Sequence, residues 1–240
     1  MKIVAFGAWG VHDLYNALYQ FGLAGIRVDA VVCAKAKQVL SDLTLQRAGN
    51  RFVPRAVEDL GGAFVPFYFV KNHNDHHCHE LLEMLQPDLV INLGTPNILR
   101  TEALNLPRVG VLNCHPGWLP DYRGCTCVEW AIYNGDPVAA TCHFMTEGID
   151  EGPIIVQRVM PVVPGTEYAQ IRAEMVDHQA KTMIEGIQRI AAEGLSKASL
   201  PSQGEGRYYR VIPDELMSEI KEKTRNGGYR SDRSQGLSIS

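Results

Sequence analysis

Short apolar runs alternate with amphipathic stretches through the first half of this 240-residue chain. Apolar runs of about four to eight residues are typical of strands buried on both faces, and amphipathic stretches between them are typical of crossover helices. The pattern therefore indicates an α/β fold built on a parallel sheet. The expected strands are residues 2–7, 28–33, 63–67, 89–93 and 110–113, and the expected helices are 12–22, 75–85 and 101–106.

The pattern changes after residue 137. Strand-like stretches at 139–145 and 154–163 flank a Gly-rich turn, which predicts a β-hairpin with a long loop. Apolar residues then recur at helical spacing across 167–192, which predicts a long helix over the sheet. We therefore expect a Rossmann-like, mostly parallel twisted sheet flanked by helices, with a C-terminal β-hairpin, a long helix and a short arm. The expected divisions are a main domain at 1–195, the arm at 196–228 and a disordered Ser-, Gly- and Arg-rich tail at 229–240.

Charge and hydropathy exclude several partners. The net charge is −4 and the basic residues are scattered, so no basic stripe is expected to bind nucleic acid. No run of 18 apolar residues suits a membrane span, and the amino terminus enters a strand-like segment without a signal pattern. We therefore expect a cytoplasmic protein with no membrane contact. The six cysteines are too few and scattered for a disulfide scaffold.

Two clusters of potential metal ligands are weighed against simpler interpretations. Cys125 and Cys127 have one residue between them, fewer than zinc knuckles use. His73, His76, His77 and His79 surround Cys78, but Asp75 before them is well placed to cap a helix whose first turn happens to be rich in histidine. We favour the cap and expect no metal site.

Asn113 and His115 stand at the end of a predicted strand, followed by a loop rich in Pro and Gly. Alternation along the strand points both side chains to one face. An amide donor beside an imidazole can hold a developing oxyanion and move a proton near neutral pH. Asp150, in the predicted hairpin loop, could return to the same place, orient His115 and raise its pKa. From residue types alone, ordinary loop-capping side chains would explain the pattern equally well.

A set of motifs favours the catalytic interpretation. The set is Asn113-x-His115, PGWLPDYRG at 116–124, WAI at 130–132, GD at 135–136 and GIDEGPII at 148–155. Their order and spacing are highly specific. Through these motifs the chain resembles the folate-dependent formyltransferase family, which includes methionyl-tRNA formyltransferase, glycinamide ribonucleotide transformylase and the sugar-nucleotide N-formyltransferases. The resemblance in fold covers residues 1–195, which would then be the catalytic domain.

The resemblance implies roles for individual residues. Asn113 and His115 match the oxyanion-stabilising pair of the family, and Asp150 matches its aspartate near the formyl group. Our own hypothesis is that His115 is protonated when it stabilises the oxyanion. The stretches that would hold the pterin end of 10-formyltetrahydrofolate are Asn97, Ile98 and Leu99, together with Thr146, Glu147, Gly148, Ile149 and Asp150. No metal is implied. Trp118 departs from the family loop; it could reshape the acceptor pocket or pack inside, and packing is favoured.

The acceptor is the least determined part. Candidate contacts are Trp9 and His12 after the first strand, where a plain strand-to-helix turn is the stronger interpretation, and Tyr122 and Arg123 in the loop. The segment after the long helix is too short for the further domain of the tRNA enzymes and resembles the arm of the sugar-nucleotide enzymes. We therefore expect a nucleotide-linked amino sugar as acceptor. Glycinamide ribonucleotide, and third an amino acid side chain or peptide precursor, remain alternative acceptors. Hydrolysis to formate and folate binding without turnover remain alternative functions, and homodimerisation through the arm is left open.

Overall fold

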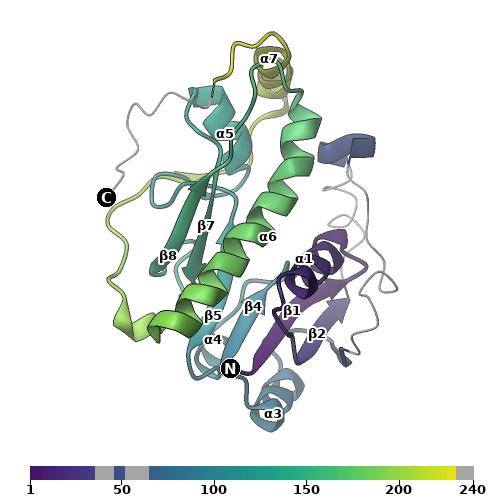
Figure 1. Ribbon diagram of the computed structural model, residues 1–240, viewed down its shortest axis with the longest axis vertical. Helices are drawn as coiled ribbons and strands as arrows, with labels where there is room; N and C mark the ends of the chain where they lie inside the picture. Colours follow the sequence, from purple (N-terminus) through teal and green to yellow (C-terminus); the bar gives the residue numbers. More distant parts are fainter. Residues whose placement is uncertain (36–45, 52–64, 231–240) are drawn as a thin grey trace.

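The computed structural model describes residues 1–35, 46–51 and 65–230, and a seven-stranded sheet forms its centre (Figure 1). The strand order is β3-β2-β1-β4-β5-β7-β8. The first five in chain order run parallel, and β7 and β8 are antiparallel additions at one edge. Their bounds are β1 Ile3–Trp9, β2 Ala30–Lys35, β3 Phe67–Val70, β4 Leu89–Asn92, β5 Gly110–His115, β7 Ala139–Phe144 and β8 Ile154–Val159.

Helices cover both faces of the sheet, which explains why its parallel strands are apolar throughout. Ile3 and Ala5 of β1 pack in one core cluster, whereas their neighbours Val4 and Phe6 pack in the other. The first cluster takes in α1 (His12–Leu23), α5 (Cys127–Asn134) and the long α6 (Tyr168–Glu193). The second takes in α3 (His76–Leu85) and α4 (Thr101–Asn105). In Figure 1, α6 crosses the sheet diagonally with α1 beside it.

The C-terminal arm folds back onto the loop that follows β5. Its strand β9 (Tyr208–Tyr209) pairs in parallel with β6 (Arg123–Gly124) of that loop. The remaining short elements are η1 (Gly49–Arg51), η3 (Lys197–Ser199) and α7 (Asp214–Arg225). After α7, Tyr229 is only 1% exposed, and its hydroxyl donates to the carbonyl of Asp136 at 2.9 Å. The expected disorder from 229 onward is therefore wrong at this residue, and residues 231–240 lie outside the described chain.

The mostly parallel Rossmann-like sheet, the hairpin and the long helix are confirmed. The third strand is displaced from its expected position, since it begins at Phe67; residues 63 and 64 lie outside the described ranges. Trp118 packs in the core, 9% exposed, as favoured.

The histidine-rich segment begins helix α3, and Asp75 caps that helix as predicted from the sequence. Asp75 caps α3, because its carboxylate accepts from the backbone N–H of Cys78 at 2.9 Å. His73 is fully buried with its Nε2 3.0 Å from the carbonyl of Val32, while His76 is exposed and pairs with Glu80. Over the described ranges, no three His, Cys, Asp or Glu side chains converge on a point that could hold a metal ion.

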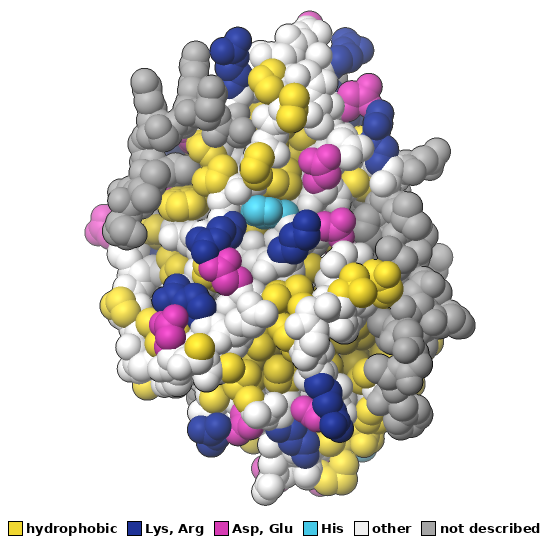
Figure 2. All heavy atoms as spheres, viewed as in Figure 1, with side chains coloured by type: hydrophobic (Ala, Val, Ile, Leu, Met, Phe, Trp, Pro, Cys, Tyr) yellow, Lys and Arg dark blue, Asp and Glu magenta, His cyan; other side chains and the backbone are white. Residues whose placement is uncertain are grey.

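On the face drawn in Figure 2, acidic and basic side chains are interspersed, and no broad basic patch gathers there. None of the described helices is long and apolar enough to cross a bilayer.

Candidate active site

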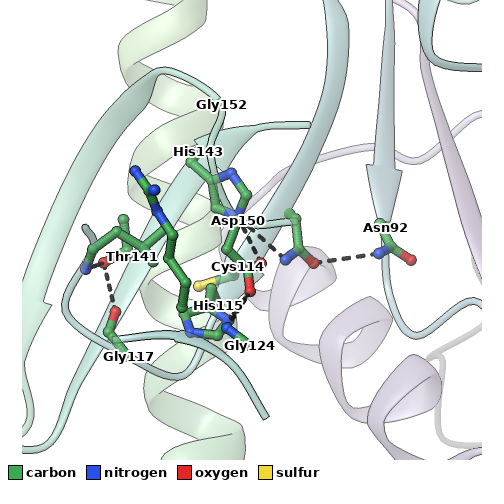
Figure 3. Close-up of polar contacts among 12 residues, drawn as sticks. Asn92, Cys114, His115, Gly117, Gly124, Thr141, His143, Asp150 and Gly152 are labelled. Carbon is green, nitrogen blue, oxygen red and sulfur yellow. Dashed lines mark hydrogen bonds and ion pairs between the residues drawn. The ribbon is translucent and has the colours of Figure 1, made fainter. Parts of the chain in front are cut away.

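The three residues singled out by sequence meet at the end of β5. Asn113 and His115 lie on β5, where they pair with His143 and Thr141 of antiparallel β7. Asp150 lies in the turn between β7 and β8 and adopts the left-handed backbone conformation, with φ of 56°. Figure 3 shows Asp150 between His115 and His143. Its Oδ2 is 3.4 Å from Nδ1 of His115 and its Oδ1 is 3.7 Å from Nε2 of His143.

A chain of hydrogen bonds fixes the orientation of the Asn113 amide. Asn92 accepts from the backbone N–H groups of Gly94 and Thr95 through Oδ1, so its Nδ2 is the atom that faces Asn113. This Nδ2 donates to Oδ1 of Asn113 at 3.3 Å, and Nδ2 of Asn113 in turn donates to Nε2 of His143 at 3.3 Å. An amide nitrogen carries two hydrogens. Within the part of the chain that the structure describes, the second N–H of Asn113 is left available to a ligand.

The same chain sets the protonation of His143. Its Nε2 must be bare to accept from Asn113, so its Nδ1 carries the hydrogen and donates to the carbonyl of Phe144 at 2.9 Å. Burial lowers the pKa of His143 to about 4, while Asp150 acts in the opposite direction and His115 adds to the lowering. His143 is therefore a neutral ring at pH 7 that orients Asn113.

His115 is held in the opposite tautomer. Its Nε2 lies 2.7 Å from the carbonyl of Tyr122 and must donate to it. Burial lowers the pKa of His115, and the charge of Asp150 and the Tyr122 bond only partly oppose this shift. The expectation that Asp150 raises the pKa is thus right for its own contribution but wrong for the sum, because desolvation is larger. The neutral ring presents a bare Nδ1 to the carboxyl of Asp150.

Glycine and threonine let the loop reach His115. A Cβ on Gly117 would stand 2.7 Å from Nε2 of His115 and 2.8 Å from the Tyr122 carbonyl, so any side chain there would separate the two. Thr141, opposite His115 on β7, donates to the carbonyl of Gly117 at 2.7 Å. The turn after β5 is therefore tied to both strands of the site.

Two cavities adjoin this group of residues. The larger, about 570 Å³, has Asn92, Thr95, His143 and Asp150 on its wall. Every residue expected to hold the pterin lines it except Thr146: Asn97, Ile98, Leu99, Glu147, Gly148, Ile149 and Asp150. Ile98 and Ile149 are 69% and 42% exposed, so apolar surface is offered to a ligand here. Thr146 directs its hydroxyl to the carbonyl of Gly148 at 3.4 Å and shapes the turn.

The smaller cavity, about 260 Å³, has Asn113 on its wall. It shares Asn92 and Thr95 with the larger one, and α1 and α6 supply most of the remaining wall. These helices contribute the residues Asp13, Ala17, Phe21, Val176, Gln179, Ala180 and Met183. Asn113 thus stands on the wall of the smaller cavity, while His143 and Asp150 stand on that of the larger.

The four expected acceptor contacts fare differently. Trp9 is 44% exposed at the end of β1 and forms an aromatic cluster with Phe67 and Phe69. His12 begins α1, but its side chain lies outside what the structure describes. Tyr122 is 2% exposed and stacks on Tyr209 of the arm, and Arg123 is 9% exposed and donates to the arm at Gly204. Neither Tyr122 nor Arg123 lines the two cavities, so the substrate contact expected of them is not supported.

Asn92, His143 and Gln203 belong to the site but were not predicted from the sequence. His143 lies within the apolar run of β7, and only the register that places it opposite Asn113 reveals its role. Had that antiparallel pairing been inferred, a histidine opposite Asn113 would have been the available signal. Gln203 reaches the site from the arm, where it donates to the carbonyls of Asp150 and Gly152.

Comparison with known proteins identifies a family. The formyl transferase family profile matches residues 1–187. The methionyl-tRNA formyltransferase of Thermotoga maritima is 30% identical over 144 residues, which cover 59% of this chain and 46% of that protein. The chain spans about half the length of the curated relatives it matches.

Solved structures share the fold. Glycinamide ribonucleotide transformylase 1 from Symbiobacterium toebii superposes with a TM-score of 0.60 at 25% identity, covering 89% of this chain and 94% of the other. A sugar N-formyltransferase from Shewanella sp. FDAARGOS_354 has a TM-score of 0.59 at 17% identity, with coverage of 88% and 77%. The family resemblance expected from the motifs is confirmed.

Proposed function

This chain belongs to the formyl transferase family, and we propose that it transfers a formyl group from 10-formyltetrahydrofolate to the amine of a nucleotide-linked amino sugar. The observation that carries the proposal is a pair of cavities that share Asn92 and Thr95 on their walls, with Asn113 lining the smaller cavity and its hydrogen-bond partner His143 lining the larger. A transfer reaction needs donor and acceptor to meet at one reacting carbon, and this arrangement provides the meeting point.

The larger cavity is suited to the folate donor. A pterin is flat, with an apolar face and polar edges, and this cavity combines exposed apolar side chains with the backbone of two loops. Ile98 supplies apolar surface from the segment after β4, and Ile149 supplies it from the hairpin turn. The side chains of Asp150 and His143 also line this cavity, and we place the formyl group beside them.

The smaller cavity and the surface beside it suit a small amine attached to a larger, ring-bearing group. The volume of the cavity is large enough for a sugar but not for part of a macromolecule. Trp9 and Phe69 are exposed near the carboxyl ends of β1 and β3, the two parallel strands that flank β2, and ligands of open α/β sheets bind at this edge. Such aromatic rings can stack on a nucleobase. The fold likeness to a sugar N-formyltransferase supports the same class of acceptor.

Asn113 would stabilise the transition state. As the acceptor nitrogen attacks the formyl carbon, negative charge grows on the formyl oxygen, and the available N–H of Asn113 would donate to it. Asn92 and His143 hold that amide beforehand, so no reorientation is needed during the reaction. Preorganised donors of this kind contribute about 3 to 4 kcal/mol to catalysis.

His115 and Asp150 would move the proton. The bare Nδ1 of His115 and the carboxyl of Asp150 face each other 3.4 Å apart, so a proton given up by the attacking amine can be held between them. The same proton would then pass to the folate nitrogen as its bond to the formyl carbon breaks. In this scheme His115 begins the cycle neutral, since burial lowers its pKa, whereas our hypothesis from the sequence had a protonated ring.

Two alternatives use the same residues. Glycinamide ribonucleotide is a second candidate acceptor, favoured by the likeness to the transformylase from Symbiobacterium toebii. The second alternative is hydrolysis of 10-formyltetrahydrofolate to formate. Water would then attack the formyl carbon beside Asn113 in place of the amine, and the smaller cavity would not have to bind an acceptor.

An acceptor panel tests the proposal. The purified protein is incubated with 10-formyltetrahydrofolate and nucleotide-linked amino sugars, with glycinamide ribonucleotide and an amine-free reaction alongside. We expect an amino sugar to gain the mass of one formyl group as tetrahydrofolate is released. Formylation of glycinamide ribonucleotide alone would replace the acceptor, and folate turnover without any amine would indicate a hydrolase.

A further inference from the structure

The arm reaches the active site through a single side chain. Nε2 of Gln203 lies 3.0 Å from the carbonyl oxygen of Asp150 and 2.6 Å from that of Gly152, and it donates to both. The two carbonyls stand on either side of Glu151, in the turn that carries Asp150. One amide nitrogen therefore bridges the backbone of the turn at the residue whose carboxyl faces His115.

The turn needs this support because its backbone is in a costly conformation. Asp150 has φ of 56°, a left-handed value that costs a residue with a side chain free energy unless its surroundings hold it there. On its side-chain end, Oδ2 of Asp150 accepts from the backbone N–H of Gly124 at 2.9 Å. Gln203 donates to the backbone carbonyl of Asp150, so hydrogen bonds hold both the side chain and the main chain of Asp150.

The orientation of the Gln203 amide is itself determined. Its Oε1 accepts from Nη2 of Arg123 at 3.2 Å, and the same Nη2 donates to the carbonyl of Gly204 at 2.9 Å. Guanidinium groups only donate, so the oxygen of the amide must face Arg123 and its nitrogen must face the turn. Arg123 directly precedes Gly124, the other support of Asp150, and the two supports are thus joined in sequence.

Close packing holds the arm in place. A Cβ on Gly206 would clash with the carbonyl oxygen of Pro120 and stand 2.9 Å from Cζ of Arg123. A Cβ on Gly204, only two residues earlier, would meet nothing within 4 Å. Tyr209 then stacks on Tyr122 with ring centroids 5.0 Å apart, next to the carbonyl that fixes His115.

We infer that the C-terminal arm is a working part of the active site, and that Gln203 is a positioning residue that sets the Asp150 carboxyl against Nδ1 of His115. The inference rests on the proposed formyl transfer, since it assigns the arm a part in that reaction. Gln203 does not line either cavity described above and acts through Asp150.

Gln203→Glu provides the kinetic test, because it keeps the size and the acceptor for Arg123 while removing both donors. Misplacing a reacting group by about 1 Å can cost on the order of 100-fold in rate. We expect kcat to fall about 10- to 100-fold, with the KM for the acceptor within about threefold of wild type. Ser202→Ala, an exposed neighbour on the arm, should retain wild-type kcat.

Two further comparisons separate positioning from general loss of structure. In an Asp150→Asn background, Gln203→Glu should lower kcat by less than about threefold, because the group it positions is already lost. Gly206→Ala should reproduce the loss of kcat, whereas Gly204→Ala should not. Wild-type kcat in Gln203→Glu, or an equal fold loss in the Asp150→Asn background, would overturn the inference.

A readout without turnover keeps this inference distinct from the proposed function. His115 is titrated by NMR in the wild type and in the uncharged variant Gln203→Met. Asp150 and His143 are the titratable groups that act on His115, and Arg123 acts on His143. Withdrawal of the Asp150 carboxyl should shift the midpoint of His115 further down. If wild type formylates nothing but the shift occurs, the proposed function fails and the arm retains its positioning role. An unchanged midpoint would refute that role.

Discussion

Replacing Asn92 with Asp should remove the oxyanion donor without touching the residue that provides it. Asp keeps the shape of Asn92 and keeps the oxygen that accepts from the N–H groups of Gly94 and Thr95. It loses the Nδ2 that donates to Oδ1 of Asn113 at 3.3 Å. Two oxygens would then face each other, and the amide of Asn113 is expected to turn over.

The energies favour that turn. A hydrogen bond from Asn113 to the new carboxylate contributes about 1.5 to 3 kcal/mol, as bonds to charged groups do. Turning the amide presents an oxygen to Nε2 of His143, which must then take the hydrogen from its Nδ1 and give up the 2.9 Å bond to Phe144, at about 1 kcal/mol. The turned amide directs a lone pair, rather than an N–H, at the developing oxyanion.

Loss of one such donor lowers kcat by about 100- to 1,000-fold. The assay is steady-state formyl transfer with both substrates varied, alongside denaturant unfolding, in which the free energy of unfolding should change by no more than about 1 kcal/mol. In an Asn113→Ala background, Asn92→Asp should have almost no further effect. A kcat within about threefold of wild type, or an undiminished loss in that background, would refute the reasoning.

Four further outcomes are expected. Gly117→Ala should separate Nε2 of His115 from the Tyr122 carbonyl and lower kcat at least 10-fold. The control is Gly22→Ala, which should have the kcat of wild type because a Cβ on Gly22 meets nothing within 4 Å. Trp9→Ala should raise the KM for a nucleotide-linked acceptor about 5- to 150-fold, since stacking on a base contributes about 1 to 3 kcal/mol. An unchanged KM would exclude stacking. Activity should fall as pH drops through the lowered pKa of His115, below 6.5, and a pH–rate limb above 6.5 would contradict a neutral starting ring. The pKa of His143 is about 4 in the folded chain and 6.5 in the unfolded chain, so between these pH values protons bind preferentially to the unfolded chain. The free energy of unfolding should therefore be at its full value above pH 6.5 and fall by up to about 3 kcal/mol toward pH 4. Chemical denaturation across this pH range measures the fall.

The sequence was sufficient to predict the elements that carry the site. Buried parallel strands are apolar on both faces, so β1, β4 and β5 stand out as short runs, and the motifs around Asn113 and Asp150 are specific. These signals are local, and each can be recognised without knowing how distant segments of the chain pack.

What the sequence did not indicate depends on pairing between distant segments. His143 faces Asn113 only because β7 runs antiparallel to β5 in one particular register. Gln203 contacts Asp150 only because the arm pairs with the loop at Arg123 and Gly124. The direction of the His115 pKa shift likewise depends on burial, which charge pattern alone does not give.

One labelled single-turnover reaction tests the central claim most directly. The protein is mixed in excess with 10-formyltetrahydrofolate carrying ¹³C in the formyl group and with the amino sugar that the panel identifies, and the label is followed by NMR. With wild type, the label should move to the acceptor nitrogen, and with Asn113→Ala the rate should fall at least 100-fold. Label released as free formate, or transfer by Asn113→Ala at the wild-type rate, would contradict formyl transfer at this site.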